Sequence, residues 1–393
     1  MSTRAQTANI GTAARNATLV PLILFSLGHY FVDLYSGALG ALQPLLVKQH
    51  GLRLAEAGLL GGVLVFSSSM TQPAYGYLSD RWRTRLFAAL GPAVAGIFIS
   101  ALGVAPSYVW LLAAVLLGGA GISAFHPQAT SRATLGIEEK RGRAMAIFIS
   151  AGTLGFACGP AYFSFLAGRY GLPNILWGAV PGIIISGFLL FALPQPPASA
   201  STAPGFDWAP LREYWRPIAL LYALVFLRSA VQVVFAQFVP LYLTLERGYS
   251  HTAASLALTG YLTAGALGGF MGGHLADRFG GRFVITISMI GAVPFLLVFF
   301  LGSGAVALFA LALGGLVLLF TIPVNVVMAQ DLVPSQAGTV SALMMGFAWG
   351  TSGLVFIPLT GYLSDHISMH YALMGLLAFP LIGGVLALRL PKR

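Results

Sequence analysis

The chain has 393 residues, of which 57% are hydrophobic and only 8% are Asp, Glu, Lys or Arg. A soluble domain carries about 25% charged residues, so this sequence has too few charges to cover a water-exposed surface, and a soluble enzyme is excluded. The net charge of +10 is spread over many short loops, which argues against a nucleic-acid-binding protein. The single cysteine, Cys158, excludes an internal disulfide and a cysteine-based metal site.

The hydrophobic segments are long enough to cross a membrane, because a spanning helix needs about 20 apolar residues. Twelve spans of about 22 residues would use about 264 positions and leave only short connections. We predict an all-α polytopic membrane protein with transmembrane helices over 21–43, 57–77, 86–104, 108–131, 144–167, 174–193, 217–243, 253–276, 283–302, 305–329, 339–363 and 370–390. The polar first 17 residues lack the apolar core and cleavage site of a signal peptide, so the first helix is expected to remain uncleaved.

Basic residues are distributed unequally between the two sides of the predicted helices. The side with both termini holds Arg4, Arg15, Arg81, Arg83, Arg85, Arg132, Lys140, Arg141, Arg143, Arg212, Arg216, Arg278, Arg282, Arg389, Lys392 and Arg393. The other side holds only Lys48, Arg53, Arg169 and Arg247. Because Lys and Arg concentrate in cytoplasmic loops, we expect a multi-pass protein of the cell (inner) membrane with both termini in the cytoplasm.

The middle of the chain differs in composition from the predicted helices. The run PQPPASASTAPGFDWAPLREYWRP, from Pro194 to Pro217, is rich in Pro, Ser and Ala and is typical of a flexible linker. A short surface helix is expected near Leu211–Trp215. The sequence therefore predicts an N-terminal six-helix bundle over 1–193, a cytoplasmic linker over 194–216 and a C-terminal six-helix bundle over 217–393.

An internal repeat supports two related halves. The pattern G-x-L-x-D-R-x-x-x-R follows the second predicted helix at 76–85 and the eighth at 273–282, and the two copies are 197 residues apart. This separation is about half the length of the chain. A repeat at that distance indicates duplication of a six-helix unit, which predicts two pseudo-symmetric bundles.

The repeated loop resembles the signature of the major facilitator superfamily, and the resemblance covers the whole chain. A narrower resemblance, to the fosmidomycin resistance protein group of bacterial drug exporters, is carried by the runs Gly28–Asp33, Phe125–Pro127, Ala329–Pro334 and Gly346–Gly350. The resemblance implies the major facilitator fold, with two bundles around a central cavity lined by helices 1, 4, 7 and 10. It also implies alternating access by rocking of one bundle against the other. A fold does not identify a substrate.

The resemblance further implies that the two loops form a conformational latch. Its members would be Gly76, Asp80, Arg81 and Arg85 in the first copy and Gly273, Asp277, Arg278 and Arg282 in the second. The two carboxylates would meet the N-terminal ends of helices 11 and 5, where a helix dipole favours negative charge. Alternatively, these charges only fix the topology.

Helix 5 contains Gly155, Gly159 and Pro160, which resemble the antiporter motif of drug exporters, although the usual glycine pair after it is missing. Glycines at four-residue spacing also allow close helix packing in lipid. The sequence leaves both an antiporter role and simple packing open.

Two ionisable residues fall near the middle of predicted spans: Asp33 in helix 1 and Arg228 in helix 7. Such residues are costly in a membrane and usually mark a transport pathway. Desolvation would favour the neutral form of Asp33, whereas a nearby Arg228 cation would oppose it. We expect Asp33 to couple transport to protons, with His29 on the same helix face as a second candidate. A buried structural ion pair between Asp33 and Arg228 is the alternative.

Further polar and aromatic residues lie on helices that the resemblance places around the cavity. We predict that the substrate contacts Arg228, His126, Tyr30, Gln232, Phe235 and Asn325. Polar groups beside aromatic rings suit a small polar or anionic molecule. His126 precedes Pro127, which removes a backbone donor, so His126 could instead stabilise a helix kink.

The function favoured by these features is proton-coupled export of small organic compounds, anionic or polar and drug-like. The alternative within transport is proton-coupled uptake of an organic anion, and a non-transporting membrane receptor is a third possibility that does not explain the two intramembrane charges. No nucleophile triad, metal-ligand spacing or phosphate-binding loop is present, so we predict no enzymatic activity, no cofactor and no metal site. The expected partners are a small-molecule substrate, protons and the lipid bilayer, and the protein is expected to function as a monomer.

Overall fold

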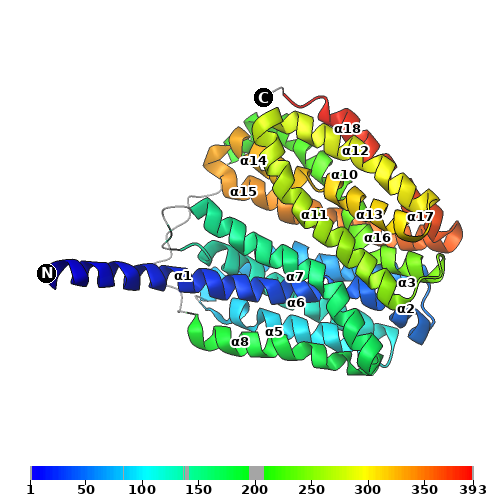
Figure 1. Cartoon of the computed structure of the whole chain (residues 1–393), viewed down its shortest axis with the longest axis horizontal. Helices are drawn as coiled ribbons and strands as arrows, with labels where there is room; N and C mark the ends of the chain where they lie inside the picture. Colours follow the sequence, from blue (N-terminus) through cyan, green and yellow to red (C-terminus); the bar gives the residue numbers. More distant parts are fainter. Residues whose placement is uncertain (1, 83, 136, 138–140, 194–207, 392–393) are drawn as a thin grey trace.

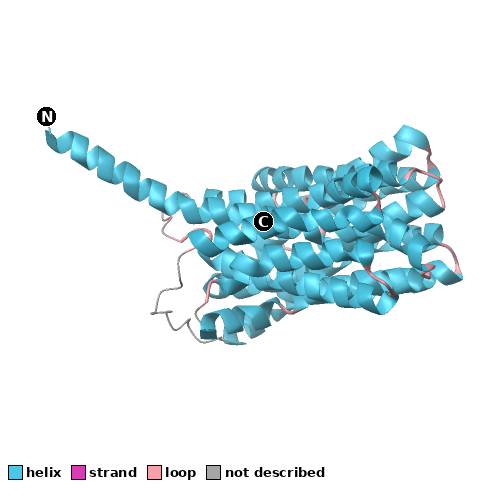
Figure 2. Cartoon of the chain, turned by 90° about the horizontal axis from the view of Figure 1, so that it is seen from below, coloured by secondary structure: helices cyan, strands magenta, loops and turns pink. Residues whose placement is uncertain are grey.

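The computed structural model describes residues 2–391 except 83, 136, 138–140 and 194–207. Within these ranges every regular element is a helix, as Figure 2 shows. Twelve helices or helix runs are long and apolar enough to cross a membrane. The prediction of an all-α protein with twelve spans is therefore confirmed.

The first six spans are built from α1 (Ser2–Ser36), α2 (Ala38–His50), α3 (Leu54–Val65), the π-helix η1 (Phe66–Met70), α4 (Gln72–Trp82), α5 (Leu86–Ser100), η2 (Ala101–Val104), α6 (Tyr108–Arg132), α7 (Arg141–Tyr170), η3 (Leu172–Gly178) and α8 (Ala179–Ala192). The first span was predicted to end at residue 43, but helical structure continues to His50. It ends at Gly51, whose φ of 61° is a conformation that glycine adopts without strain.

The second six spans are built from α10 (Trp215–Leu245), α11 (His251–Phe279), α12 (Gly281–Leu301), α13 (Gly304–Leu318), α14 (Thr321–Leu332), η4 (Pro334–Gln336), α15 (Ala337–Ala342), the π-helix η5 (Leu343–Phe347), α16 (Ala348–His366), α17 (Met369–Gly375) and α18 (Ala378–Ala387). The short helix α9 (Trp208–Glu213) precedes them and lies slightly before its predicted position.

Because the number of spans is even, both ends of the chain lie on the same side of the helices (Figure 1). We call this side the terminal face. The turns between α2 and α3 and between α16 and α17 lie at the other end of the helices, which we call the opposite face (Figure 1).

Two hydrophobic cores form, one in each half of the chain. The first is drawn from residues between Leu22 and Leu193. The second is drawn from residues between Ile218 and Leu390, together with Ala57, Val65 and Ala157 from the first half. Large apolar side chains such as Phe191 and Leu301 point outward, 90% and 76% exposed, as expected of helices that face lipid. Most of the predicted linker, 194–207, lies outside the described residues, and the domain boundaries remain a prediction.

The two halves pack together mainly through three pairs of elements: α3 with α16, α7 with α11, and α2 with α10. Smaller contacts join η1 to α16 and η5, and α2 to α11. These pairs meet from the middle of the spans to the opposite face. Toward the terminal face the second span continues as α4 and the eleventh begins as α15. Among the described elements, α4 and α15 do not pack against each other to a comparable extent. The halves are therefore held together mainly at the opposite face.

Candidate functional site

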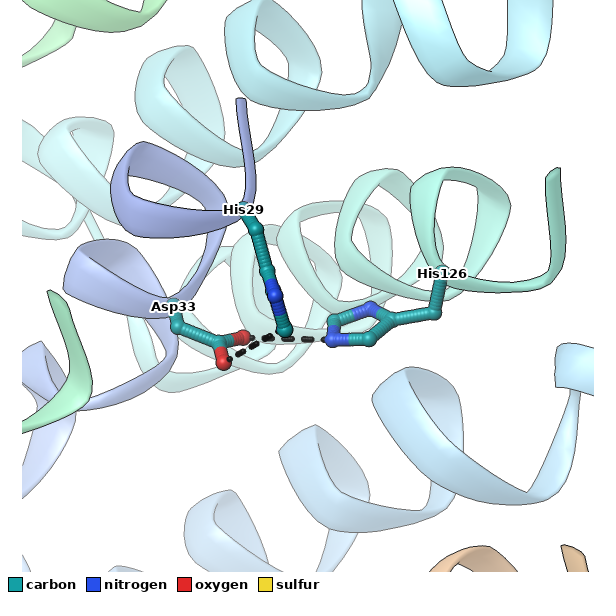
Figure 3. A group of neighbouring side chains, drawn as sticks. All are labelled: His29, Asp33 and His126. Carbon is teal, nitrogen blue, oxygen red and sulfur yellow. Dashed lines mark ion pairs between the residues drawn. The ribbon is translucent and has the colours of Figure 1, made fainter. Parts of the chain in front are cut away.

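Three ionisable side chains meet inside the N-terminal half. His29 and Asp33 lie one turn apart on α1, and His126 reaches them from α6, as Figure 3 shows. The Nε2 atom of His29 lies 3.2 Å from Oδ2 of Asp33, and Nε2 of His126 lies 3.3 Å from Oδ1. We call these residues the His–Asp–His cluster. Sequence analysis predicted all three as site residues but did not predict that both histidines contact the same carboxylate.

Close packing between α1 and α7 holds one side of this cluster. A β-carbon at Gly152 would collide with the His29 ring, and one at Gly155 or Gly159 would collide with a backbone carbonyl of α1. Glycine at these positions therefore lets the two helices approach each other. The same α7 contains Pro160. The packing role of Gly155 and Gly159 is thus visible, while an antiporter-specific role of this motif remains a prediction.

Backbone carbonyls orient both histidine rings. Nδ1 of His29 lies 2.8 Å from the carbonyl oxygen of Phe148, and the ring stacks on that phenylalanine at 4.2 Å between centroids. Nδ1 of His126 lies 2.8 Å from the carbonyl oxygen of Ile122, one turn earlier in α6. Helix α6 continues through Pro127 to Arg132. The ring of His126 is thus fixed by its own helix and directed at Asp33.

The cluster is mostly shielded but not sealed. The side chains of His29, Asp33 and His126 are 9%, 18% and 19% exposed. One nitrogen of each histidine and one carboxylate oxygen of Asp33 lie within 4.8 Å of one another. In the described part of the chain, no other three His, Cys, Asp or Glu side chains come as close together. An unpaired charge at this depth would be strongly unfavourable, so the two histidines supply the partners that make Asp33 tolerable there.

A second polar group lies in the C-terminal half. Arg228 of α10 is 5% exposed and donates a hydrogen bond from Nη1 to the side-chain oxygen of Gln232. Its Nε atom has no hydrogen-bond partner, and neither has the Tyr261 hydroxyl or the Asn325 side-chain amide, although all three are buried. Among the described side chains, Asp33 and Arg228 form no ion pair with each other, so the ion-pair alternative is not realised in this conformation.

Two predicted substrate contacts lie in other surroundings. Phe235 is fully buried in an aromatic group of the C-terminal core, with its ring centroid 5.8 Å from that of Tyr261 and 6.0 Å from that of Phe300. Tyr30 packs edge-on against Phe31 at 5.2 Å. The structure thus places His126 in contact with Asp33 and Gln232 in contact with Arg228, while Phe235 is part of the hydrophobic core.

The predicted latch residues lie at the terminal face. Gly76 and Asp80 are in α4, and the Asp80 side chain lies outside the described part of the structure. Arg81 donates to the Tyr77 hydroxyl at 3.2 Å, and Arg85 donates to the Leu193 carbonyl.

In the second copy, Gly273 and Asp277 line a cavity of about 470 Å³ together with Asp331. Arg278 lies over the Phe279 ring at 5.1 Å, and Arg282 lies in the first turn of α12. No ion pair of Asp277 is present among the described side chains, so the latch remains a prediction.

Sequence analysis missed the polar contacts that join the halves. Asp365, at the end of α16, accepts hydrogen bonds from the backbone N–H groups of Leu54 and Ala55 at the start of α3, both at 2.9 Å. Gln43 donates to Gln237 at 3.1 Å across the first and seventh spans. His251 donates from Nε2 to the Ala41 carbonyl at 2.7 Å.

One signal for Asp365 was present in the sequence. The pentapeptide Gly-Tyr-Leu-Ser-Asp occurs at 76–80, in the predicted latch, and again at 361–365. In both copies a proline lies three residues before the glycine. Because the copies are 285 residues apart, a search limited to the half-chain repeat does not find them.

Comparison with protein families identifies the chain as a transporter. It matches the model of the Major Facilitator Superfamily over residues 25–353 and 221–393. It is 29% identical over 382 residues to YfnC, an uncharacterized MFS-type transporter of Bacillus subtilis (strain 168), covering 94% of this chain and 92% of YfnC. It is 27% identical over 364 residues to the fosmidomycin resistance protein of Escherichia coli (strain K12), covering 91% of this chain and 89% of that protein.

Solved structures show the same fold at low sequence identity. A bacterial homolog of the human lysosomal transporter Spinster, in an inward-facing and occupied conformation, superimposes with a TM-score of 0.77 at 15% identity, covering 95% of this chain and 96% of that one. The nucleoside transporter NupG gives a TM-score of 0.74 at 14% identity, covering 94% and 98%. With twelve spans and a family match over most of its length, this chain belongs to the major facilitator superfamily and is a secondary transporter, not an enzyme.

Proposed function

We propose that this protein exports small anionic or polar organic compounds in exchange for protons, by alternating access. The observation that carries the proposal is the His–Asp–His cluster, a carboxylate held between two imidazoles on two helices in the middle of the membrane-spanning region. Imidazole is the side chain whose charge changes most readily near neutral pH. Intramembrane carboxylates and histidines commonly form proton pathways.

The partial exposure of Asp33 and His126 supports this role. A proton carrier must be reached from water in one conformation and shielded in another. Exposures of 18% and 19% provide access, while the close packing of α1 on α7 at Gly155 and Gly159 shields the rest of the cluster. Rocking of the N-terminal half would alter this access, because the cluster lies within that half.

Arg228 supports an anionic substrate group. It is a permanent cation buried in the C-terminal half, and its Nε atom has no partner. A buried polar atom without a hydrogen bond costs about 1–3 kcal/mol, and a bound anion would supply an acceptor. Asn325 and Tyr261 have unpaired polar atoms as well, and Gln232 is already bonded to Arg228. We assign these four residues to the substrate side of the exchange.

The contacts between the halves support a conformation open toward the cytoplasm. Asp365, Gln43 and His251 link the halves near the opposite face. The loops rich in Lys and Arg lie at the terminal face, which the basic-residue rule places in the cytoplasm. In this assignment the substrate enters from the terminal face, and outward movement requires the opposite face to open while the Asp80 and Asp277 loops close the terminal face.

Proton-driven flux in proteoliposomes tests the proposal. Fosmidomycin, the compound after which one relative is named, is the first probe, followed by a panel of anionic and cationic drugs. An imposed pH gradient should drive the uphill movement of at least one anionic compound in the direction opposite to proton flow. Drug movement that is independent of the pH gradient would overturn the coupling, and movement in the same direction as protons would overturn the export assignment.

A further inference from the structure

The two histidines of the cluster have a fixed tautomer. A backbone carbonyl oxygen can only accept a hydrogen bond. The Nδ1 atoms of His29 and His126, each 2.8 Å from such an oxygen, must therefore carry hydrogen. A neutral ring then has a lone pair on Nε2, and in both rings Nε2 is the atom that faces Asp33 (Figure 3).

This tautomer determines how many protons the cluster needs. With both rings neutral and Asp33 ionised, each Nε2 lone pair faces a carboxylate lone pair, which is repulsive. A proton placed between one ring and one oxygen converts that contact into a hydrogen bond. The two rings contact different oxygens, at 3.2 Å and 3.3 Å, so one proton satisfies only one contact. The observed geometry is satisfied when two protons are bound.

Among the described side chains, the ion-pair partners of Asp33 are His29 and His126, and no Lys or Arg, including Arg228, takes the place of these protons. The packed helices α5 and α8 contain no Asp, Glu, Lys, Arg or His. The charges of α6 and α7 lie near their ends, at Arg132, Arg141, Arg143 and Arg169. The other titratable side chains in the central parts of α1 and α7 are Tyr30, Tyr35, Cys158 and Tyr162, none of which can supply a positive charge.

We propose that the His–Asp–His cluster takes up and releases two protons as one unit during each transport cycle. Its net charge changes from −1 to +1 on loading. The inference rests on the proposed proton-coupled transport and adds its stoichiometry. Loading closes both contacts and draws His126 of α6 toward α1, and release makes both contacts repulsive and loosens them.

Nuclear magnetic resonance of the protein in lipid bilayers counts these protons without any substrate. Nitrogen-15 shifts of the labelled histidines and carbon-13 shifts of the Asp carboxyls are followed between pH 9 and pH 5, with signals assigned through His29→Gln, His126→Gln and Asp33→Asn. The three side chains should together gain two protons, and both neutral rings should carry hydrogen on Nδ1. A gain of one proton, or neutral rings protonated at Nε2, would overturn the inference.

His366 is the matched control. Its Nδ1 atom also lies 2.8 Å from a carbonyl one turn earlier, that of Tyr362, but no carboxylate faces its Nε2 among the described side chains. It should show the same Nδ1–H tautomer. Its signals should be unchanged in Asp33→Asn, whereas those of His29 and His126 should shift. If the His29 and His126 signals do not respond to Asp33→Asn, the cluster does not titrate as a unit.

The zero-flux drug gradient in proteoliposomes separates this inference from the proposed function. With the membrane potential clamped at zero, each coupled proton makes one pH unit equivalent to about a tenfold drug gradient. Two protons predict about a hundredfold fosmidomycin gradient per pH unit, and one proton about tenfold. A tenfold gradient would reject only the two-proton count. A pH-independent gradient for every drug of the panel would reject proton coupling itself.

A second inference comes from the repeated pentapeptide. Asp365 ends one copy and caps the start of α3 through the Leu54 and Ala55 N–H groups. Asp80 ends the other copy, at the terminal-face end of the same second span. Spans 2 and 11 are antiparallel partners, since α3 packs on α16. If the 285-residue separation of the two pentapeptides relates span 2 to span 11, the residues that correspond to Leu54 and Ala55 are Thr339 and Val340. Both lie in the first turn of α15.

The family resemblance already implies the contact of Asp80 with the start of the eleventh span. We infer that Asp365 is its counterpart at the opposite face, so that spans 2 and 11 form a reciprocal latch. In the present conformation Asp365 caps span 2 and holds the opposite face closed. In the alternate conformation Asp80 caps span 11 at the Thr339 and Val340 N–H groups and holds the terminal face closed. Each carboxylate interacts with the partial positive charge at the N-terminal end of the other span. The two contacts lie at opposite ends of the spans, so rocking of the halves forms one contact and breaks the other.

Spin-label distances test the reciprocity. In a Cys158→Ala background, labels at Ser107 and Ser303, both exposed starts of helices at the opposite face, report its opening. Asp365→Asn should increase the long-distance population several-fold, Asp80→Asn should decrease it, and the double variant should lie near the wild type. Changes in the same direction, or no change in Asp365→Asn, would overturn the latch.

Glu246 provides the matched control for the latch. Its carboxylate accepts from the Met369 and His370 N–H groups at 2.9 and 3.0 Å, the same type of cap, but within the C-terminal half. Glu246→Gln should lower thermal stability without changing the distance distribution. An equal redistribution in Glu246→Gln would mean that the Asp365→Asn effect is general destabilisation.

Discussion

The two halves of this transporter share a repeated loop but carry opposite charges at related positions. Asp33 lies in the first span and Arg228 in the seventh. Arg228 is only two residues from the position 197 residues after Asp33. In the N-terminal half two histidines surround the carboxylate, while in the C-terminal half Arg228 is bonded to an uncharged glutamine and has an unpaired Nε. In the proposed function, the position in the N-terminal half serves protons and the related position in the C-terminal half serves an anion.

The same divergence is visible where the halves touch at the opposite face. The repeat relates Leu54 to His251 and Asp365 to Gly168. In one contact the carboxylate of Asp365 caps the start of α3. In the related contact Gly168 lies beside Thr252 without a carboxylate, and His251 instead bonds to the Ala41 carbonyl. The two contacts are equivalent in position but differ in chemistry, so they are expected to differ in strength.

The largest effect is expected from Asp33→Asn. Asparagine resembles the neutral carboxyl group and cannot release a proton, so export driven by a pH gradient should be lost. Exchange of drug for drug should continue, because that step requires rocking without net proton movement. Drug binding should lose most of its dependence on pH between about 5 and 8. Flux assays in proteoliposomes measure all three properties.

Full pH-driven transport by Asp33→Asn would show that Asp33 does not carry the coupling. His29→Gln and His126→Gln would then be the next variants. Loss of drug-for-drug exchange together with coupling would instead indicate that Asp33 is needed for the conformational change.

The second prediction concerns Arg228. Arg228→Ala should weaken the binding of an anionic drug about thirtyfold or more, since removing one member of a buried charged contact costs about 2–5 kcal/mol. Arg228→Lys should retain part of the affinity, because lysine keeps the charge but not the planar fork. Binding of a neutral drug in the same assay is the control. Normal anion binding and transport by Arg228→Ala would reject the assignment.

The fold could be predicted in detail because its signals are local. Span length, charge bias and the 197-residue repeat act along the chain and need no knowledge of packing. The site was predicted in part. Asp33, His29 and His126 were singled out because ionisable residues are rare at this depth. Their meeting on one carboxylate depends on how α1 lies against α6, which the sequence does not specify.

The surroundings of Phe235 and the residues that sequence analysis overlooked have the same explanation. Phe235 shares a helix face with Arg228 in sequence, yet its ring packs into the aromatic core beside Tyr261 and Phe300. Tyr261 and Asp365 were overlooked because their importance comes from residues far away in the sequence. Asp365 lies at the end of a span, where a single carboxylate is ordinary until its partner helix is known.

A smaller effect is expected from Asp277→Asn. This residue lies in the second copy of the latch loop. The residue that the repeat relates to Asp365 is Gly168, so this second latch has no carboxylate at the opposite face. An interaction with a helix terminus is worth about 0.3–1 kcal/mol, so turnover should fall about two- to fivefold while the drug binding constant stays the same. Asp80→Asn should have the larger effect, because Asp80 is part of the reciprocal pair. Stopped-flow transport and equilibrium binding separate the two quantities, and a changed binding constant with normal turnover would contradict the latch.

The smallest effect is expected from His251. Its Nε2–H donates to the Ala41 carbonyl at 2.7 Å, and its Nδ1 lies 3.4 Å from the Ser164 hydroxyl, which can donate to it. A neutral ring satisfies both contacts, so this link needs no charge. His251→Phe keeps the ring but removes both hydrogen bonds, and a net loss of about 0.5–1.5 kcal/mol for each is typical. The opposite-face distances from Ser107 to Ser303 should therefore shift in the same direction as in Asp365→Asn, but less. Because the ring is neutral, the shift should not depend on pH between 6 and 8. A redistribution larger than that of Asp365→Asn would mean that the α7–α11 contact, rather than the carboxylate cap on α3, dominates closure of this face.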